Sequence, residues 1–388
     1  MRSALGGLAA ALLLLVAAQP ATASTTPAQV GLVSFTRASL SGDSATLTLD
    51  WGDTARARSY QIFMSRSYSM SSPKVLSSTS STRTVTGLVR GVSYFFQVRA
   101  VNGGAVGSKS SRVGHTTIRS QGAGGGSTYR VMTYNLCSEK CSGWATTRKA
   151  PALARIAAFK PDVVALQEAG RLALSPPTGY GQAAYKSAKM LWFNGNRFKV
   201  AMTTCPAGDA SCMPALRSGW IALGGTRYAV WAELVDLDTE KSTVFVSVHT
   251  TPGKSDEAAL LRRDETLVLV RALAKLNPEQ RPVVYAGDFN SHKNRSNDYL
   301  AGVFHSRGYY DAFDLAMSLR RQHHNSYNDF SVRPVISYKW GDHVDHVWVR
   351  PGDGKVLSWQ NGASIVDGRM VTPIPSDHSP VVVDVRLN

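Results

Sequence analysis

Long apolar runs are almost absent from this 388-residue sequence. The one candidate, from Ala4 to Ala18, carries no polar side chain, but it is shorter than the roughly 20 residues that a membrane-spanning helix needs. It follows Arg2 and precedes the small residues Ala21-Thr22-Ala23, which is the pattern of a signal peptide and its cleavage site. We therefore predict that residues 1–23 are a signal peptide and that the mature protein is secreted (extracellular).

Cysteine is also scarce, with four residues. Neither neighbouring pair, Cys137 with Cys141 or Cys205 with Cys212, has the two-residue spacing that is usual in zinc sites. An even number of cysteines in an exported chain indicates disulfides instead, although four cysteines allow three connectivities. Because Cys205 and Cys212 enclose the turn-like sequence PAGDAS, we expect the two local pairs, Cys137–Cys141 and Cys205–Cys212.

Acidic side chains are few relative to basic ones: 27 Asp and Glu stand against 43 Lys and Arg, a formal net charge of +16. This charge exceeds the magnitude of about 2–8 that is enough to keep a small domain soluble. A basic secreted protein attracts polyanions such as nucleic acid, anionic lipid or an acidic cell wall. The charge alone does not choose among them.

One segment, SQGAGGGS at residues 120–127, has the composition of a flexible linker. We place the linker at residues 118–128, between an N-terminal unit (28–117) and a C-terminal unit (129–388). Residues 28–119 carry 11 basic and 3 acidic side chains, whereas residues 129–388 carry 31 and 24. The N-terminal part therefore has the larger basic excess for its length, and we expect it to hold the protein on DNA or an acidic cell wall.

No helical period appears in the N-terminal unit. Its sequence alternates polar and apolar residues in short runs separated by Gly, Ser and Asp, which favours a β-sandwich; the runs are SATLTLDW, SYQIFMS, TRTVTGL and SYFFQVRAVN. With Trp51, Tyr60 and the TGL at 86–88, these runs resemble a fibronectin type III module. The resemblance implies an all-β spacer or binding domain in which Trp51, Tyr94 and Phe96 belong to the core.

The C-terminal unit mixes helices and strands, which favours a layered α/β fold. Residues 149–159 have an amphipathic pattern with apolar positions 153, 156, 157 and 159 on one face. Residues 255–277 form a longer predicted helix, with Ser255 as its cap. We expect the tandem Arg262-Arg263 on the solvated face of that helix.

Apolar strands of this unit repeatedly begin or end in polar residues. Leaving one such group buried without a partner costs about 1–3 kcal/mol, so a shared site is the simpler explanation. The residues concerned are Asn135, Glu168, His249, Asp288, Asn290, Asp345, Asp377 and His378. In YAGDFNS, the period of a strand would place Asp288 and Asn290 on the same face.

Carboxylate and amide oxygens without thiolates suit a hard divalent cation such as Mg²⁺ or Mn²⁺. Together with histidine and carboxylate pairs that move protons, such a cation is suited to phosphoester hydrolysis.

The order of these motifs is similar to that of the endonuclease/exonuclease/phosphatase (deoxyribonuclease I-like) superfamily, over residues 129–388. The resemblance implies a four-layer, two-sheet α/β sandwich with the site where strand ends of both sheets meet. It implies that Glu168 is the main metal ligand, helped by Asn135 and Asp377. It further implies the following roles for the other residues: water activation and phosphate binding for Asp288 and Asn290, a proton relay for His378 with Asp345, and a phosphate contact for His249. Where the family often has an Asn before that first His, this chain has Ser247.

Basic residues follow the YAGDFNS motif, and we expect Lys293 and Arg295 to contact substrate phosphate. Together with export and the positive charge, they favour a secreted, monomeric endonuclease for DNA and/or RNA. The alternative is a phospholipase-C-like enzyme for sphingomyelin or inositol phosphates, which needs an exposed hydrophobic loop that does not stand out in the sequence. A non-catalytic surface-binding protein is a third reading, and a structural Ca²⁺ is compatible with the enzyme readings.

Overall fold

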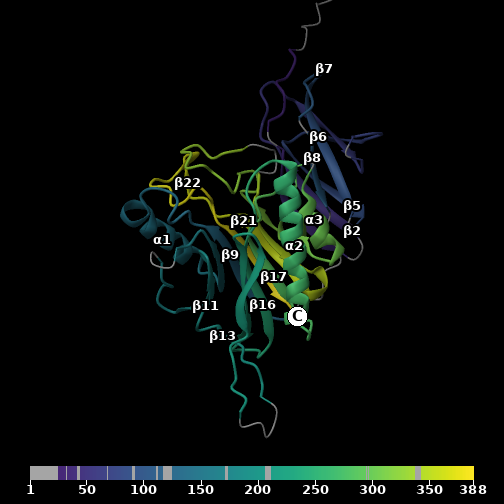
Figure 1. Ribbon diagram of the computed structural model, residues 1–388. Coiled ribbons are helices and arrows are strands. Elements are labelled where there is room, and N and C mark those ends of the chain that lie inside the picture. Colours follow the sequence, from purple (N-terminus) through teal and green to yellow (C-terminus); the bar gives the residue numbers. More distant parts are fainter. Residues whose placement is uncertain are drawn as a thin grey trace, which may run out of the picture.

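The computed structural model of the protein describes residues 25–31, 33–41, 44–67, 69–89, 92–110, 112–116, 125–170, 174–205, 211–293, 295, 297–336 and 342–388. The predicted signal peptide (1–23) and most of the predicted linker (118–128) lie outside these residues. Among the helices in the described ranges, none is long and apolar enough to cross a membrane. The described residues form an all-β unit followed by a larger α/β unit (Figure 1).

The N-terminal unit is a sandwich of two antiparallel sheets. One has the order β1-β2-β5, with β1 (Ser34–Ser41), β2 (Ser44–Asp50) and β5 (Thr82–Val89). The other has the order β4-β3-β6-β7 with β8 beside β6; its strands are β3 (Ser59–Ser65), β4 (Lys74–Ser78), β6 (Ser93–Asn102), β7 (Ala105–Val106) and β8 (Val113–Thr116). The four strands predicted from the alternating runs all form.

The core of the sandwich lies between the two sheets. Alternate residues of β2, Ala45, Leu47 and Leu49, are buried there, as period-two geometry requires. Trp51 and Phe96 are buried in the same cluster, and Tyr94 is buried with its hydroxyl accepting from the backbone N–H of Val89. The prediction that these aromatic residues form core is confirmed.

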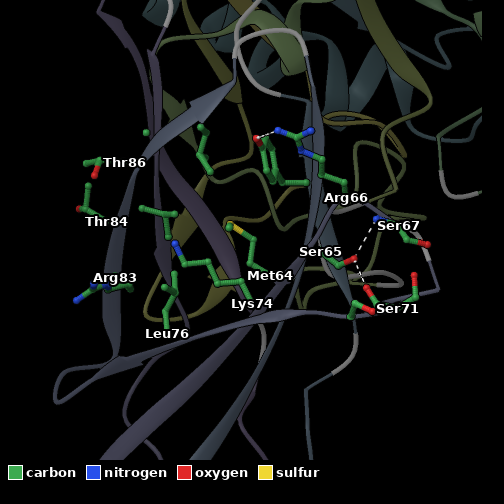
Figure 2. A pocket seen from close by; sticks show the side chains of 15 residues that line it. Met64, Ser65, Arg66, Ser67, Ser71, Lys74, Leu76, Arg83, Thr84 and Thr86 are labelled. Carbon is green, nitrogen blue, oxygen red and sulfur yellow. Dashed lines mark hydrogen bonds between the residues drawn. The ribbon is translucent and has the colours of Figure 1, made fainter.

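An open groove of about 710 Å³ lies between β3, β4 and β5. Figure 2 shows Met64 and Lys74 extending into it, whereas Arg83 points away from it in this view. The guanidinium of Arg66 turns toward the hydroxyl of Tyr94, at 3.4 Å. No acidic side chain lines the groove within the described residues, so its lining carries positive charge only.

The C-terminal unit contains two mixed sheets. The first has the order β11-β12-β10-β9-β24-β21-β19, with β9 (Thr128–Asn135), β10 (Val163–Gln167), β11 (Tyr180–Lys186), β12 (Lys189–Asn194), β19 (Leu319–Arg320), β21 (Gly354–Asn361) and β24 (Val381–Leu387). The second has the order β13-β15-β16-β17-β20-β18 with β14 beside β15; its strands are β13 (Phe198–Val200), β14 (Ser218–Gly224), β15 (Arg227–Asp236), β16 (Ser242–His249), β17 (Val283–Asp288), β18 (Tyr310–Asp311) and β20 (Asp345–Val349). A small hairpin joins β22 (Ile365–Val366) to β23 (Arg369–Met370).

Helices cover the outer faces of both sheets, which gives four layers (Figure 1). Helix α1 (Lys149–Phe159) packs Ala152 and Ile156 onto the first sheet. Helix α2 (Asp256–Leu276) packs Leu269 and Leu273 onto the second sheet, beside α3 (Tyr299–Ser306). Short helical segments complete the unit: η1 (Trp144–Arg148), α4 (Ala312–Leu315) and η3 (Pro351–Asp353). The predicted layered α/β fold is confirmed.

Both predicted helices form. In α2 the hydroxyl of Ser255 caps the helix by accepting a hydrogen bond from the N–H of Ala258, at 3.2 Å. Two details of the predictions are wrong. Ala157 of α1 is exposed, and Arg262 of α2 is buried, because Arg262 donates from Nη1 to the carbonyl oxygens of the loop before the helix.

The expectation that no hydrophobic loop is exposed is also wrong. The connection between β13 and β14 extends from the body of the unit (Figure 1), and Met202, Met213 and Leu216 on it are 54%, 85% and 58% exposed. The predicted pair Cys205–Cys212 closes this connection as a disulfide, and the predicted pair Cys137–Cys141 forms as well.

The two units touch beside β1 and β19. There the buried amide of Gln322 donates a hydrogen bond to the carbonyl oxygen of Phe35. The sandwich is therefore seated on the α/β unit at this point and is not attached by the linker alone.

Candidate active site

Strand pairing brings the predicted polar residues to one edge of the two sheets. In the first sheet, Asn135 at the end of β9 lies opposite Gln167 at the end of the parallel strand β10. In the second, Asp288 at the end of β17 pairs with both His249 of β16 and Asp345 of β20. Glu168 follows β10, and Asp377 and His378 precede β24, so these three residues lie near the same edge.

Asp288 lies at the centre of this group and is buried. Its Oδ2 accepts a hydrogen bond from Nδ2 of Asn135, at 3.0 Å, and its Oδ1 accepts from the backbone N–H of Asn290, at 2.9 Å. Burial raises the pKa of Asp288 to about 6; the charge of His378 opposes this shift, and that of Asp345 adds to it. Asp288 is therefore a carboxylate that takes up a proton close to neutral pH.

The glycine before Asp288 permits this placement. A Cβ on Gly287 would lie 2.2 Å from the carbonyl oxygen of Val248 in β16, closer than any side chain can approach. The strand then ends at Asp288, and Asn290 has a left-handed φ of 50°. Strand alternation does not reach Asn290, so the period that led to the same-face prediction does not apply to it. The Nδ2 of Asn290 donates a hydrogen bond to the carbonyl oxygen of Thr250, at 3.1 Å.

His378 is held between two carboxylates. Its Nδ1 lies 2.8 Å from Oδ2 of Asp345, and its Nε2 lies 3.8 Å from Oδ2 of Asp288. Burial opposes protonation of this ring, but the charges of Asp345 and Asp288 outweigh it and raise the pKa of His378 to about 10. His378 is therefore an imidazolium at neutral pH.

His249 approaches Asp288 from the other side, with Nε2 at 3.5 Å from Oδ2. Burial, together with the positive charges of Arg227 and Lys189, holds the pKa of His249 well below its usual value. Its ring is therefore neutral at neutral pH. Ser247, two residues before His249, donates a hydrogen bond to the carbonyl oxygen of Leu166, at 2.9 Å. This bond links β16 to the first sheet.

The carboxylates of Glu168 and Asp377 complete the site. Glu168 has a left-handed φ of 48°, and its Oε1 lies 2.9 Å from Nζ of Lys140 and 3.9 Å from Nε2 of His249. Burial raises the pKa of Asp377, and the negative charge of Glu168 adds to this shift. The negative charges of these two carboxylates repel each other, and Lys140 beside Glu168 and His378 beside Asp377 offset part of this repulsion.

This donor set fits a hard divalent cation. Four carboxylates converge, and Oδ1 of Asp345 is buried with no hydrogen-bond partner among the described residues. Asp288, Asp345 and His378 place ligand-type atoms within 4.8 Å of one another, but the protonated ring of His378 repels a cation. Glu168, Asp377 and the amide of Asn135 are consequently the better ligands. The sulfurs of Cys137 and Cys141, beside Asp377, are joined in the disulfide and do not take part.

The side chains of Lys293 and Arg295 pair with other groups of the protein. Nζ of Lys293 pairs with Asp314, and Nη1 of Arg295 donates to the carbonyl oxygen of Asn290, at 2.7 Å. In this arrangement Arg295 stabilises the turn that carries Asn290. Their contact with substrate phosphate stays a prediction.

A cavity of about 400 Å³ adjoins Glu168 and His249 and was not expected from the sequence. Lys140, Lys189 and Arg227 line it, with Glu139 and Tyr228. These cations come from three segments far apart in the sequence, and no motif connects them. Only the excess of basic residues hinted that such a cluster would exist somewhere on the molecule.

Comparison with known proteins agrees with this geometry. The model of the Endonuclease/Exonuclease/phosphatase family matches residues 132–378, and the model of the Fibronectin type III domain matches residues 30–116. No curated protein matches the chain.

Solved structures share the fold of the C-terminal unit. An endonuclease/exonuclease/phosphatase family protein from Bacteroides thetaiotaomicron is 18% identical, with a TM-score of 0.51 over 68% of this chain and 99% of that one. A mannosyl-6-phosphatase from the same organism is also 18% identical, with a TM-score of 0.50 over 66% of this chain and 99% of its own. The catalytic domain of human nocturnin is 18% identical, with a TM-score of 0.47 over 67% and 94%.

Proposed function

Because the chain belongs to the endonuclease/exonuclease/phosphatase family of phosphoesterases, we propose that it is a divalent-metal-dependent phosphodiesterase that hydrolyses nucleic acid. One observation carries the proposal. Carboxylates, a protonated histidine (His378) and a neutral one (His249) meet where the strands of both sheets end, around the buried Asp288.

The two oxygens of Asp288 are oriented by Asn135 and by the backbone of Asn290. With a pKa of about 6, this carboxylate is ionised at neutral pH and accepts the proton of an attacking water. The imidazolium of His378, oriented by Asp345, compensates the negative charge that grows on the phosphate. The neutral ring of His249 donates a hydrogen bond to a phosphate oxygen.

Enzymes of this family generally use a divalent metal. Glu168 would hold it, with Asn135 and Asp377, and we propose Mg²⁺ or Mn²⁺ because the donors are oxygens. Such a cation, when bound, polarises the phosphoryl group and stabilises the leaving oxygen.

The cationic cavity beside Glu168 and His249 supports a polyanionic substrate. Lys140, Lys189 and Arg227 attract a second phosphate next to the one being cleaved, which nucleic acid provides at every nucleotide. The same charges repel the quaternary ammonium of sphingomyelin.

A phospholipase-C-like activity is the second candidate. The exposed side chains of Met202, Met213 and Leu216, on the extended connection between β13 and β14, favour it because they offer an apolar contact for a lipid surface. An anionic inositol phosphate headgroup is also compatible with the cationic cavity.

A substrate panel decides between these candidates. The purified protein is incubated with plasmid DNA, RNA, sphingomyelin vesicles, an inositol phosphate and mannose 6-phosphate, with Mg²⁺, with Mn²⁺ and with chelator. We expect metal-dependent cleavage of DNA or RNA, and loss of that cleavage in Asp288→Asn and His378→Ala at unchanged circular dichroism. Hydrolysis of lipid or sugar phosphate alone would contradict the nuclease proposal.

We also propose that the protein is secreted, because the signal-peptide pattern precedes a chain with two disulfides. Expression with residues 1–388 in a host that exports proteins, followed by N-terminal sequencing, tests this proposal. A mature N-terminus near Ser24 is expected, and a cell-retained chain that begins at Met1 would contradict it.

A further inference from the structure

We infer that two hairpins beside the catalytic centre form a binding site for one unstacked nucleotide, so that the substrate is single-stranded nucleic acid. This inference rests on the proposed function and deepens it. The binding site consists of Lys186, Lys189, Trp220, Arg227 and Tyr228, which we call the hairpin platform.

The platform joins the two sheets. Lys186 and Lys189 face each other across the turn of the β11–β12 hairpin, whose residues Ser187 and Ala188 have left-handed φ values of 45° and 61°. Trp220 and Tyr228 belong to the β14–β15 hairpin, which turns at Gly224-Gly225. Since the first hairpin belongs to one sheet and the second to the other, their side chains meet only in the folded protein.

One end of the platform opens onto the catalytic residues. Lys189, Arg227 and Tyr228 line the cavity of about 400 Å³ whose other walls include Glu168 and His249. Arg227 and Lys189 lie close enough to His249 that their charges help to lower its pKa. A phosphate held by these two cations therefore lies next to the phosphate that contacts His249.

Two cations of the cavity, Arg227 and Lys189, have no carboxylate partner among the described residues, whereas Lys140 is paired with Glu168. Within the described part of the chain, the guanidinium of Arg227 forms no hydrogen bond and no ion pair. Lys189 is 5% exposed, and among the described residues its Nζ donates a hydrogen bond to the carbonyl oxygen of Ser187 alone, at 2.9 Å. An anion that enters the cavity can form charge-assisted hydrogen bonds with both groups.

The other end of the platform is aromatic and faces solvent. Trp220 is 51% exposed, and its ring centroid lies 5.6 Å from that of Tyr228 in an edge-to-face arrangement. Nζ of Lys186 lies 4.4 Å from the centroid of Trp220 and 5.3 Å from that of Tyr228. A half-exposed indole with one lysine against its ring is suited to stacking a base on its open side while the lysine pairs with a phosphate.

This arrangement distinguishes substrate classes. A base stacked on Trp220 must leave its neighbours in a strand, which costs little in single strands and much in a duplex. A sugar phosphate or an inositol phosphate has no base to stack. The platform therefore selects single-stranded DNA or RNA, or the single-stranded end of a duplex.

Binding without turnover tests the inference. Fluorescence anisotropy of a labelled single-stranded decanucleotide is measured with the full chain carrying Asp288→Asn, in chelator, so that no cleavage occurs. Adding Trp220→Ala is expected to weaken binding about tenfold, which is about 1.4 kcal/mol. Trp220→Phe is expected to restore most of the affinity, because phenylalanine also stacks. Leu237→Ala, at the opposite end of β15, is the matched control for loss of exposed apolar surface and should leave the affinity unchanged.

Two further measurements separate stacking from charge. An abasic decamer is expected to bind equally well to the Asp288→Asn parent and to the variant that also carries Trp220→Ala, because it has no bases. Arg227→Gln is expected to lower the slope of log Kd against log salt by about 0.7, the value for one phosphate of a single strand, whereas Lys241→Gln should not change it. The inference is wrong if Trp220→Ala weakens binding of the abasic strand as much as binding of the intact decanucleotide. It is also wrong if Arg227→Gln leaves the slope of log Kd against log salt unchanged.

The outcome is independent of the proposed activity. If the wild-type protein cleaves DNA or RNA while Trp220→Ala binds as tightly as its parent, the platform is wrong and the function stands. If no nucleic acid is cleaved while binding still depends on Trp220 and Arg227, the function is wrong and the platform stands.

Discussion

Two histidines approach the same carboxylate oxygen of Asp288, yet they carry different charges. His378 is paired with Asp345, so its ring holds a proton up to a pKa of about 10, although burial opposes this. His249 is buried among lysine and arginine charges, and its pKa falls well below the usual value. Because the ring types are identical, the difference comes entirely from the neighbouring residues.

The charge of Asp345 predicts the pH dependence of activity. In the wild-type protein, kcat/KM is expected to rise as Asp288 loses its proton near pH 6 and to fall as His378 loses its proton near pH 10. Asp345→Asn removes a negative charge that raises both pKa values, so both limbs of the pH profile should move to lower pH. A profile of kcat/KM against pH, with Asp353→Asn as a control far from the site, checks this; an unmoved alkaline limb would show that His378 does not set it.

Glu168 is expected to dominate metal affinity. Glu168→Gln keeps the size of the side chain but removes the charge that a divalent cation needs, so the Kd for Mn²⁺ measured by calorimetry should rise at least about tenfold. Glu139→Gln provides a matched control, because Glu139 lines the same cavity and is exposed. Equal effects of the two substitutions would mean that the cavity binds cations without a specific ligand.

At the scale of elements, α2 positions the loop that follows His249. Arg262, on the first turns of this helix, donates from Nη1 to the carbonyl oxygens of Thr251 and Gly253, at 3.1 Å and 2.8 Å. Glu265, one turn later, accepts hydrogen bonds from the backbone and the hydroxyl of Thr251. These hydrogen bonds fix the position of the loop relative to helix α2.

Arg262→Met should weaken the attachment of this loop to helix α2. Removing a buried charged donor that bonds two partly exposed carbonyl oxygens is expected to lower the free energy of unfolding by about 2 kcal/mol and to lower kcat without abolishing it. The neighbouring substitution Arg263→Met alters a solvent-exposed side chain and should change stability by less than about 0.5 kcal/mol. Urea denaturation of both variants tests this, and equal stability of the two would contradict the role of Arg262.

The strands and both long helices could be predicted because each has a local signal. Apolar runs, alternation, and the cap at Ser255 lie within short stretches of sequence, and the polar residues at strand ends were visible for the same reason. The strand period did not apply to Asn290 because β17 ends at Asp288 and Asn290 itself has a left-handed φ. Arg227 and Lys189 were missed because two hairpins of different sheets bring them together, and no local pattern records that contact.

At the scale of the whole molecule, the N-terminal sandwich adds positive charge to an enzyme that already has it. We propose that its groove, with Arg66 and Lys74, holds the protein on DNA or another polyanion such as an acidic cell wall. The groove belongs to the sandwich alone, so tethering and catalysis use separate surfaces.

The double substitution Arg66→Glu with Lys74→Glu tests this tether in the full chain. We expect weaker, less salt-dependent retention on immobilised DNA or cell-wall material, with kcat unchanged on a short oligonucleotide. Arg58→Glu, also exposed on the sandwich but not part of the groove, is the control for net charge. Arg56→Glu is a second control of the same kind. If the double variant loses no more retention for each reversed charge than Arg56→Glu and Arg58→Glu do, the groove has no special role.

The strand order of the first sheet has a consequence for biosynthesis. Strand β24 lies between β9 and β21 in the middle of that sheet, although it is made after all the others. His378, immediately before it, reaches Asp345 and Asp288 only when β24 is in place. A ribosome-bound chain that lacks these residues therefore has an unfinished sheet and an incomplete proton relay, and the candidate site of the phosphoesterase forms only after β24 has been made.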